Sequence, residues 1–309
     1  MQWFNNTNEQ TTALQGKMYD AEALGFDSSI IYIQPFSLYY QRIIIPKRFS
    51  DKILAHVLSQ YLDKNYFFNP PLFLAIEGEP GEGKTSQAIA TCTQKGFIVL
   101  YVSASSFSGQ HEAESRLNMK KFYEKASILK KQGHPVAIVV DDFHKSVANE
   151  DDNVKRTINS DLLTGYLMNL AENTGNEKVP IILTANDLSK VYGPMLRVGR
   201  ADRFYWQPTT EEKMQIIQQI FNSIVANPTE KGFINFFNEN KNENIAFFNQ
   251  LLNRHRLSTI SKNMYNIKNY GIEGNIKQLN LTVNSSLLQL NYENLRALAQ
   301  EQRNERRGK

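Results

Sequence analysis

The sequence contains a single cysteine, Cys92, among 309 residues. The chain therefore cannot form an internal disulfide or a zinc site built from several cysteines, and it fits a reducing compartment. It also lacks any run that approaches the roughly 18 uninterrupted apolar residues of a membrane helix. Residues 1–10 are rich in Asn and Gln and have neither the pattern of a signal peptide nor that of a transit peptide. We therefore expect a cytoplasmic protein with no membrane partner.

Strong charge of one sign is also missing. There are 35 Lys and Arg residues and 31 Asp and Glu residues, so the formal net charge is only +4. This balance is too weak to indicate a nucleic-acid partner. A content of 41% hydrophobic and 11% aromatic residues is typical of globular proteins and excludes wholesale disorder. The length favours about two domains.

Short apolar runs alternate with helical stretches through the first two thirds of the chain. The helices are expected to begin near Lys84, Glu112 and Ile158, and another follows Pro46. This alternation predicts an α/β fold in which helices cover both faces of a parallel sheet. The strand-like runs are Leu72–Ile76, Phe97–Val102, Val136–Val140 and Pro180–Leu183.

The residue pattern and composition change after about Trp206, where the chain becomes helical and rich in Asn. We expect a helix over 209–224 and a domain boundary near residue 207. The predicted organisation is an N-terminal arm or adaptor over 1–40, an αβα domain over 41–207, a smaller helical domain over 208–299 and a charged tail over 300–309. Within the arm, Trp3 and Phe4 are the only residues that suggest docking.

The strongest motif is Gly78-Glu79-Pro80-Gly81-Glu82-Gly83-Lys84-Thr85, which matches G-x-x-x-x-G-K-[ST] between a predicted strand and a predicted helix. The glycines Gly78, Gly81 and Gly83 let backbone N–H groups turn toward phosphate oxygens, and the helix N-terminus adds partial positive charge. Lys84 is expected to reach the β- and γ-phosphates, and the Thr85 hydroxyl to hold Mg²⁺. Glu82 and Ser86 complete the predicted ATP-binding segment.

Two carboxylates follow the third apolar run. A buried strand that ends in Asp141-Asp142 delivers both side chains to the carboxyl edge of the sheet, where open α/β sheets bind ligands. Asp141 suits Mg²⁺ ligation through water, and Asp142 lies where a carboxylate would polarise the attacking water. The other interpretation is a strand end capped by two solvated acids.

Two further elements complete the pattern. The fourth run ends in Asn186, whose amide can orient the lytic water and contact phosphate without adding charge. About a dozen residues later, Arg197 and Arg200 have the spacing that lets an arginine reach a neighbouring subunit's nucleotide. A solvated basic surface is the alternative for these two arginines, and it is favoured for Arg203.

These four elements, in this order, resemble those of an AAA+ ATPase. The stretch from Val179 to Thr209 resembles Rubisco activase more closely, and Phe204-Tyr205-Trp206 followed by x-Pro-Thr is its most specific part. The likeness covers roughly residues 40–300. It implies a homo-oligomer, in the form of a hexameric ring, that releases inhibitory sugar phosphates from Rubisco with ATP and Mg²⁺. It also allows a stromal location if the gene is plastid-encoded.

The resemblance assigns further roles by position. It makes Lys84 and Thr85 the phosphate and Mg²⁺ residues, Asp142 the hydrolytic carboxylate and Asn186 the first sensor. Arg197 and Arg200 fall on the arginine-finger positions, and Arg254 falls on a sensor position of the helical domain. The central-pore loop falls on Gln110, His111, Glu112 and Ala113.

The sequence also departs from that family. Asp141-Asp142-Phe143-His144 replaces the usual Asn-Asp-Leu-Asp, residues 145–153 replace a Gly-rich stretch, and the pore loop is not Gly-rich. Glu79 and Glu82 place negative charge near phosphate. These differences leave two alternatives: an activase-like motor with another protein client, or a nucleotide-gated scaffold with little turnover. A nucleic-acid client is disfavoured by the small net charge.

Overall fold

The structure is a computed structural model that describes residues 31–62, 69–104, 114–144, 158–172, 178–189, 191–222, 225, 229–263, 271–287 and 290–307. The described residues divide into two compact units. The first lies within Met1–Glu79 and Lys84–Trp206, and the second within Pro80–Gly83 and Gln207–Lys309. The middle of the glycine-rich loop is therefore grouped with the second unit, whereas both of its ends belong to the first.

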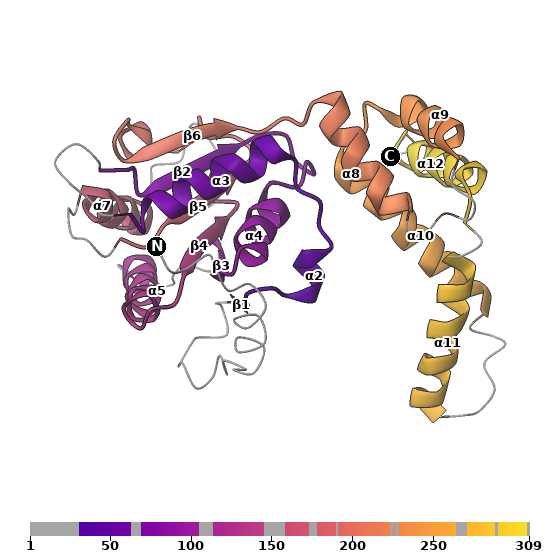
Figure 1. The fold of residues 1–309 in the computed structure, drawn as a ribbon, viewed down its shortest axis with the longest axis horizontal. Helices are drawn as coiled ribbons and strands as arrows, with labels where there is room; N and C mark the ends of the chain where they lie inside the picture. The colour runs from indigo at the N-terminus through magenta and orange to yellow at the C-terminus, as the bar shows by residue number, and fades with distance from the viewer. Residues whose placement is uncertain are drawn as a thin grey trace. The chain divides into compact units, whose positions relative to one another are not determined.

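The first unit is built on a six-stranded sheet with the order β1-β3-β4-β5-β2-β6 (Figure 1). Neighbouring strands are parallel except for β1, which pairs antiparallel with β3 at one edge. The strands are β1 Ile31–Ile33, β2 Phe73–Glu77, β3 Ile98–Ser103, β4 Val136–Asp141, β5 Ile181–Ala185 and β6 Ala201–Tyr205. The α/β fold predicted from the alternation is confirmed.

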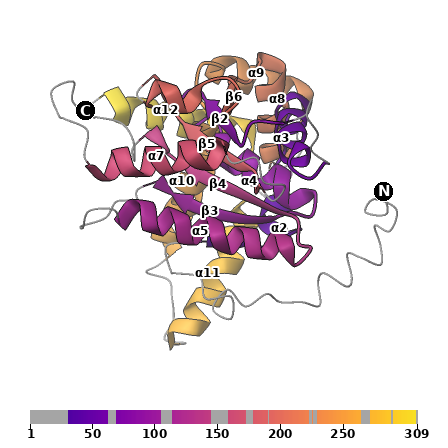
Figure 2. The ribbon, with the colours of Figure 1, turned by 90° about the vertical axis from the view of Figure 1, so that its left-hand side faces the viewer.

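Successive residues of each central strand face opposite sides of the sheet, and both sides are buried. Ala75 and Leu100 belong to one apolar cluster, whereas Leu74 and Val99 belong to the other. The first cluster includes residues of α5 (Glu114–Lys131) and α7 (Ile158–Glu172), and the second includes residues of α3 (Lys47–Ser59) and α4 (Lys84–Gln94). Figure 2 shows α5 and α7 lying across the near face of the sheet.

Two strands differ from the expectations. Ile31–Ile33, assigned by sequence to an N-terminal arm, forms the edge strand β1, and Ile33 packs into the apolar cluster with α3 and α4. The short helix α2 (Leu38–Gln41) follows it. Residues 201–205 form β6, although the sequence predicts no strand there. β6 pairs with only one neighbour, β2, so it needs no continuous apolar run.

The Phe-Tyr-Trp stretch ends the first unit, and its two outer rings pack against α3. Trp206 is fully buried, and its ring centroid lies 4.7 Å from that of Phe49 in an edge-to-face arrangement. The Arg48 guanidinium lies 4.7 Å from the Trp206 ring centroid. Tyr205, which lies between Phe204 and Trp206 in the sequence, is 56% exposed. The packing explains why the stretch carries a tryptophan at this position.

The second unit is helical. Its core is rich in phenylalanine: Phe221 and Phe236 are both fully buried, and their ring centroids lie 5.4 Å apart. Thr229 caps α9 by accepting the Gly232 N–H. The helices are α8 Thr210–Asn222, α9 Glu230–Asn240, α10 Ile245–Asn263, α11 Gly271–Leu287 and α12 Tyr292–Arg307. No helix in the described parts of either unit is long and apolar enough to cross a membrane.

Candidate nucleotide site

The glycine-rich loop joins β2 to α4, as its motif requires. Gly81 and Gly83 have φ values of 82° and 77°, in the left-handed region that glycine adopts without a steric cost. Gly78 is needed for a different reason: a Cβ atom there would overlap the backbone carbonyl oxygen of Trp206. Each predicted glycine therefore has a structural reason for its place in the loop.

Lys84 opens α4 and is only 7% exposed. Its ammonium group donates hydrogen bonds to the Gly78 carbonyl at 2.6 Å and the Glu79 carbonyl at 2.9 Å, and to Asn186 Oδ1 at 3.0 Å. These acceptors hold the charge at the start of the helix, beside the loop. The structure thus brings together Lys84 and Asn186, which are 102 residues apart in the sequence.

A second polar cluster surrounds Asp141 at the end of β4. The hydroxyls of Thr85 and Thr184 each donate to Asp141 Oδ1 at 2.6 Å, and the Tyr101 hydroxyl donates to Oδ2 at 3.2 Å. The Tyr101 pKa is raised to about 12, first by burial and then by the negative charge of Asp141. Tyr101 therefore stays protonated at neutral pH and remains a donor to the carboxylate.

Asp142 follows directly and has a φ of 53°, in the left-handed region that Asp tolerates better than most residues. Its backbone N–H donates to Asp141 Oδ1 at 3.0 Å. The next N–H, that of Phe143, donates to the Thr184 carbonyl at 2.9 Å. These two hydrogen bonds fix the backbone as it leaves β4, so both carboxylates are held at the carboxyl edge of the sheet.

The oxygen donors at Asp141 fit a magnesium ion. Mg²⁺ prefers oxygen ligands and commonly uses one or two protein side chains, with phosphates and water completing its shell. Thr85 and Asp141 supply such a pair within 2.6 Å of each other. No group of three or more His, Cys, Asp or Glu side chains suited to a metal occurs among the described residues, so these do not offer an all-protein cage.

Three residues of this region were missed by the sequence analysis: Tyr101, Thr184 and Glu77. Glu77 ends β2, accepts the Leu188 N–H at 2.9 Å and lies 3.4 Å from the Arg203 guanidinium. It therefore joins the backbone that follows β5 to the edge strand β6. An acid directly before the glycine-rich loop was the available signal for Glu77, whereas Tyr101 and Thr184 require knowledge of the strand order.

The arginines predicted to act on nucleotide have other surroundings in the structure. Arg197 is exposed, whereas Arg200 forms an ion pair with Glu172 and donates to the Pro194 carbonyl at 2.5 Å. Among the described residues, neither has a hydrogen bond or ion pair to Lys84, Asp141 or the side chains that contact them. In the second unit, Arg254 forms a bidentate ion pair with Glu305, with nitrogen–oxygen distances of 2.5 and 2.6 Å.

Two other predicted features can be located only in part. Ser86 lies in the first turn of α4 and is half-buried. Glu82 is buried in the second unit, where it pairs with Lys213. The predicted pore loop, residues 110–113, lies outside the described residues, as do residues 1–30 with Trp3 and the stretch 145–153.

A glycine-rich loop, a buried lysine and two carboxylates at the end of a parallel strand are together typical of a nucleotide-binding ATPase domain. Residues 74–209 match the family described as "ATPase family associated with various cellular activities (AAA)". This stretch of the chain is therefore similar to the ATPase domain of that family.

Within that family, the chain is similar to Rubisco activases. The activase of Anabaena sp. is 31% identical over 225 residues, which cover 68% of this chain and 53% of that protein. The chloroplastic activase of Zea mays is 31% identical over 193 residues, which cover 57% of this chain and 43% of that protein. The chain is therefore similar to AAA ATPases of the activase type, and it spans about half the length of the curated relatives it matches.

Proposed function

We propose that this protein binds ATP with Mg²⁺, hydrolyses it, and uses the free energy to remodel a protein client. The observation that carries the proposal is a pair of hydrogen bonds at one edge of the sheet, between Lys84 and Asn186 and between Thr85 and Asp141. These side chains come from three separate elements. Their arrangement supplies a cation for phosphates, oxygen ligands for a metal, and an amide that is hydrogen-bonded to the cation.

The chain's own residues would divide the chemistry as follows. The Lys84 ammonium binds the phosphates, and Thr85 and Asp141 hold the Mg²⁺, which when bound neutralises phosphate charge. Asp142 accepts a proton from the attacking water as general base. Asn186 orients that water and contacts phosphate without adding charge. Gly78, Gly81, Gly83 and Ser86 belong to the segment that surrounds the phosphates.

Coupling to a client would need a ring of subunits. We infer a homo-oligomer, most simply a hexamer, in which Arg197 and Arg200 stabilise charge on a neighbouring subunit's nucleotide. For Arg200 this role requires release from Glu172, because the ion pair occupies its guanidinium. Arg254 would sense nucleotide from the helical domain, and residues 110–113 would line the central pore.

Rubisco is the client that the relatives support, since both are named as activases of ribulose bisphosphate carboxylase/oxygenase. The proposed reaction is release of inhibitory sugar phosphates from Rubisco. The sequence departures at 143–153 and in the pore loop favour a second candidate, a motor with another client.

The test uses inhibited Rubisco from the same organism, ATP and three forms of the protein: wild type, Asp142→Asn, and Asp51→Asn. Asp51 is an exposed acid on α3, so its variant controls for loss of a carboxylate. We expect wild type and Asp51→Asn to release phosphate and restore carboxylation, and Asp142→Asn to do neither. ATP turnover without restored carboxylation would overturn the Rubisco assignment and favour a different client. Absence of turnover in the wild type would overturn the ATPase proposal itself.

A further inference from the structure

Glu82 places a buried negative charge inside the glycine-rich loop. The residue is 6% exposed, whereas the loop's other acid, Glu79, is exposed. A carboxylate in a loop that receives a polyphosphate repels it, and burial strengthens the repulsion because water screens it less. Nucleotide binding therefore requires that this charge be compensated.

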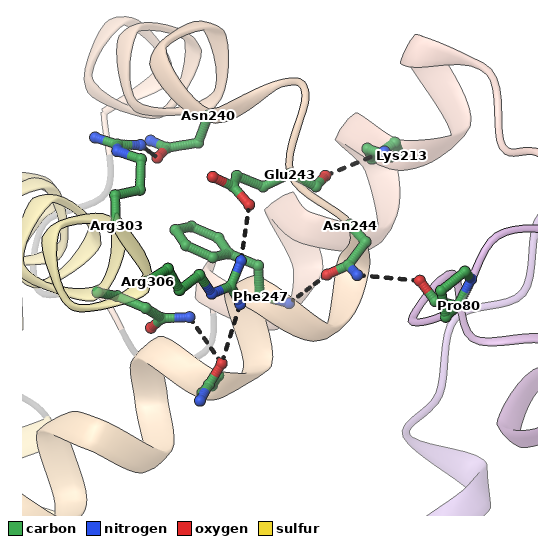
Figure 3. A network of polar contacts seen from close by, with 10 residues as sticks. Pro80, Lys213, Asn240, Glu243, Asn244, Phe247, Arg303 and Arg306 are labelled. Atoms are coloured by element: carbon green, nitrogen blue, oxygen red, sulfur yellow. Dashed lines mark hydrogen bonds and ion pairs between the residues drawn. The ribbon is translucent and has the colours of Figure 1, made fainter. Parts of the chain in front are cut away.

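Lys213 of α8 supplies the compensating charge. Its Nζ atom lies 2.9 Å from Glu82 Oε1, and the two side chains are only 13% and 8% exposed. The ammonium group also donates to the backbone carbonyl of Glu243 at 3.1 Å (Figure 3). The Glu243 carboxylate in turn lies 3.3 Å from the Arg306 guanidinium. Lys213 is therefore held in place from two directions within the second unit.

The backbone of the same loop segment is tied to the residues next to Glu243. The Asn244 side-chain amide donates to the Pro80 carbonyl at 3.0 Å, and the Ala246 N–H donates to the Gly81 carbonyl at 2.9 Å. Asn244 Oδ1 accepts the Phe247 N–H at 2.9 Å, which fixes the orientation of its amide (Figure 3). A Cβ atom on Gly81 would overlap this amide, so the approach depends on glycine.

These two ties set the direction of the loop's peptide groups. In a trans peptide, C=O and N–H point in opposite directions, and the described residues contain no cis peptide bond. With the carbonyls of Pro80 and Gly81 directed to Asn244 and Ala246, the N–H groups of Gly81 and Glu82 face the other way. This is the orientation that a loop needs in order to present N–H groups to an anion.

We propose that Lys213 is a positioning residue for nucleotide binding, which neutralises Glu82 and holds residues 80–83 in the form that accepts ATP. This inference rests on the proposed function, because it assigns a role only if the loop binds a nucleotide. It explains how a loop with an acid at position 82 can serve a polyphosphate. The role is one of charge compensation, so Lys213 need not touch the nucleotide.

The test measures the dissociation constant of Mg-ATP by calorimetry for the full chain and a set of variants. Lys213→Met removes the charge, and Lys213→Arg keeps it. Lys231→Met removes a charge from an exposed lysine of α9 and is the matched control. Glu82→Gln removes the repulsion, alone and combined with Lys213→Met. Thermal unfolding of each variant checks that it folds.

We expect Lys213→Met to weaken ATP binding on the order of tenfold, which corresponds to about 1.4 kcal/mol. Lys213→Arg and the Glu82→Gln/Lys213→Met double variant should recover most of this loss, and Lys231→Met should not change binding. Glu82→Gln alone should bind ATP at least as tightly as wild type. If Lys213→Met does not fold, the affinity of the Glu82→Gln variant still tests the proposal.

Three results would overturn the inference while leaving the proposed function standing. The first is equal ATP affinity for Lys213→Met and Lys231→Met. The second is a double variant as weak as Lys213→Met, since Lys213 would then not act through Glu82. The third is tenfold weaker binding by Glu82→Gln alone. If wild type itself does not bind ATP, the proposed function fails first.

Discussion

Thr184 provides a sharp test of the cluster around Asp141. Its side chain is 1% exposed, and its hydroxyl donates to Asp141 Oδ1 at 2.6 Å and lies 3.0 Å from the Thr85 hydroxyl. Thr184→Val keeps the shape of the side chain and removes only this hydroxyl. The change therefore tests whether Thr184 orients Asp141 or merely fills the core.

The magnitude follows from the hydrogen bonds at that oxygen. Asp141 Oδ1 accepts from Thr85, Thr184 and the Asp142 N–H, so the variant removes one of three donors. A hydrogen bond to a charged group contributes about 1.5–3 kcal/mol. We take the lower end, because water can replace part of the lost interaction. The Mg²⁺ concentration for half-maximal ATP hydrolysis should then rise about tenfold.

The assay is phosphate release over a range of Mg²⁺ concentrations at saturating ATP. The matched control is Thr93→Val, because Thr93 is fully buried in α4 and its hydroxyl donates to the Ile89 carbonyl, not to Asp141. Both variants remove one buried hydroxyl, so their thermal stabilities should be similar. An identical Mg²⁺ dependence of the two variants would refute the argument that Thr184 positions Asp141.

Three further predictions concern stability and turnover. Trp206→Ala should lower the free energy of unfolding by about 3–5 kcal/mol because it empties a fully buried site, whereas Tyr205→Ala next to it should cost less than about 1 kcal/mol in the same urea titration. Asp142→Asn should abolish ATP turnover while leaving Mg-ATP affinity within about threefold of wild type, since the proposed base acts on water; calorimetry beside a phosphate-release assay separates the two effects. Burial lowers the pKa of His56 to about 4. The unfolded chain, with an ordinary His pKa near 6.5, therefore binds the proton first as pH falls, and the folded state should lose up to roughly 3 kcal/mol between pH 6.5 and 4. Urea titrations of His56→Gln should show a flatter pH dependence over that window; an equally steep one would exclude His56 as the cause.

The sequence predicted the central strands well because each is a short, continuous apolar run that is buried on both faces. The observed strands β2 to β5 begin within one residue of the expected runs. β6 was missed because Asp202 and Arg203 interrupt its apolar residues, which an edge strand tolerates. β1 was missed because three residues cannot display a period, and only its pairing with β3 makes it a strand.

The same distinction applies to the site. The positions of Lys84, Thr85, Asp141 and Asn186 could be predicted because each ends or follows a recognisable local element, whereas their roles stay predictions. Tyr101 could not, because its contact with Asp141 depends on the register that places Ser103 opposite Asp141 across β3 and β4. A single sequence does not contain that register. Contacts across neighbouring strands therefore had to come from the structure.

The two acids of the glycine-rich loop show why the residue type alone was insufficient there. Sequence reasoning treats Glu79 and Glu82 alike, as negative charges near phosphate. In the structure, Glu79 contributes its backbone carbonyl to Lys84 while its side chain remains exposed, where solvent screens the charge. Glu82 is buried, and its charge is balanced by Lys213, which lies 131 residues away in the sequence. An acid in such a loop is compatible with phosphate binding when solvent or a fixed cation offsets its charge. In this chain, solvent screens the charge of Glu79 and Lys213 offsets that of Glu82.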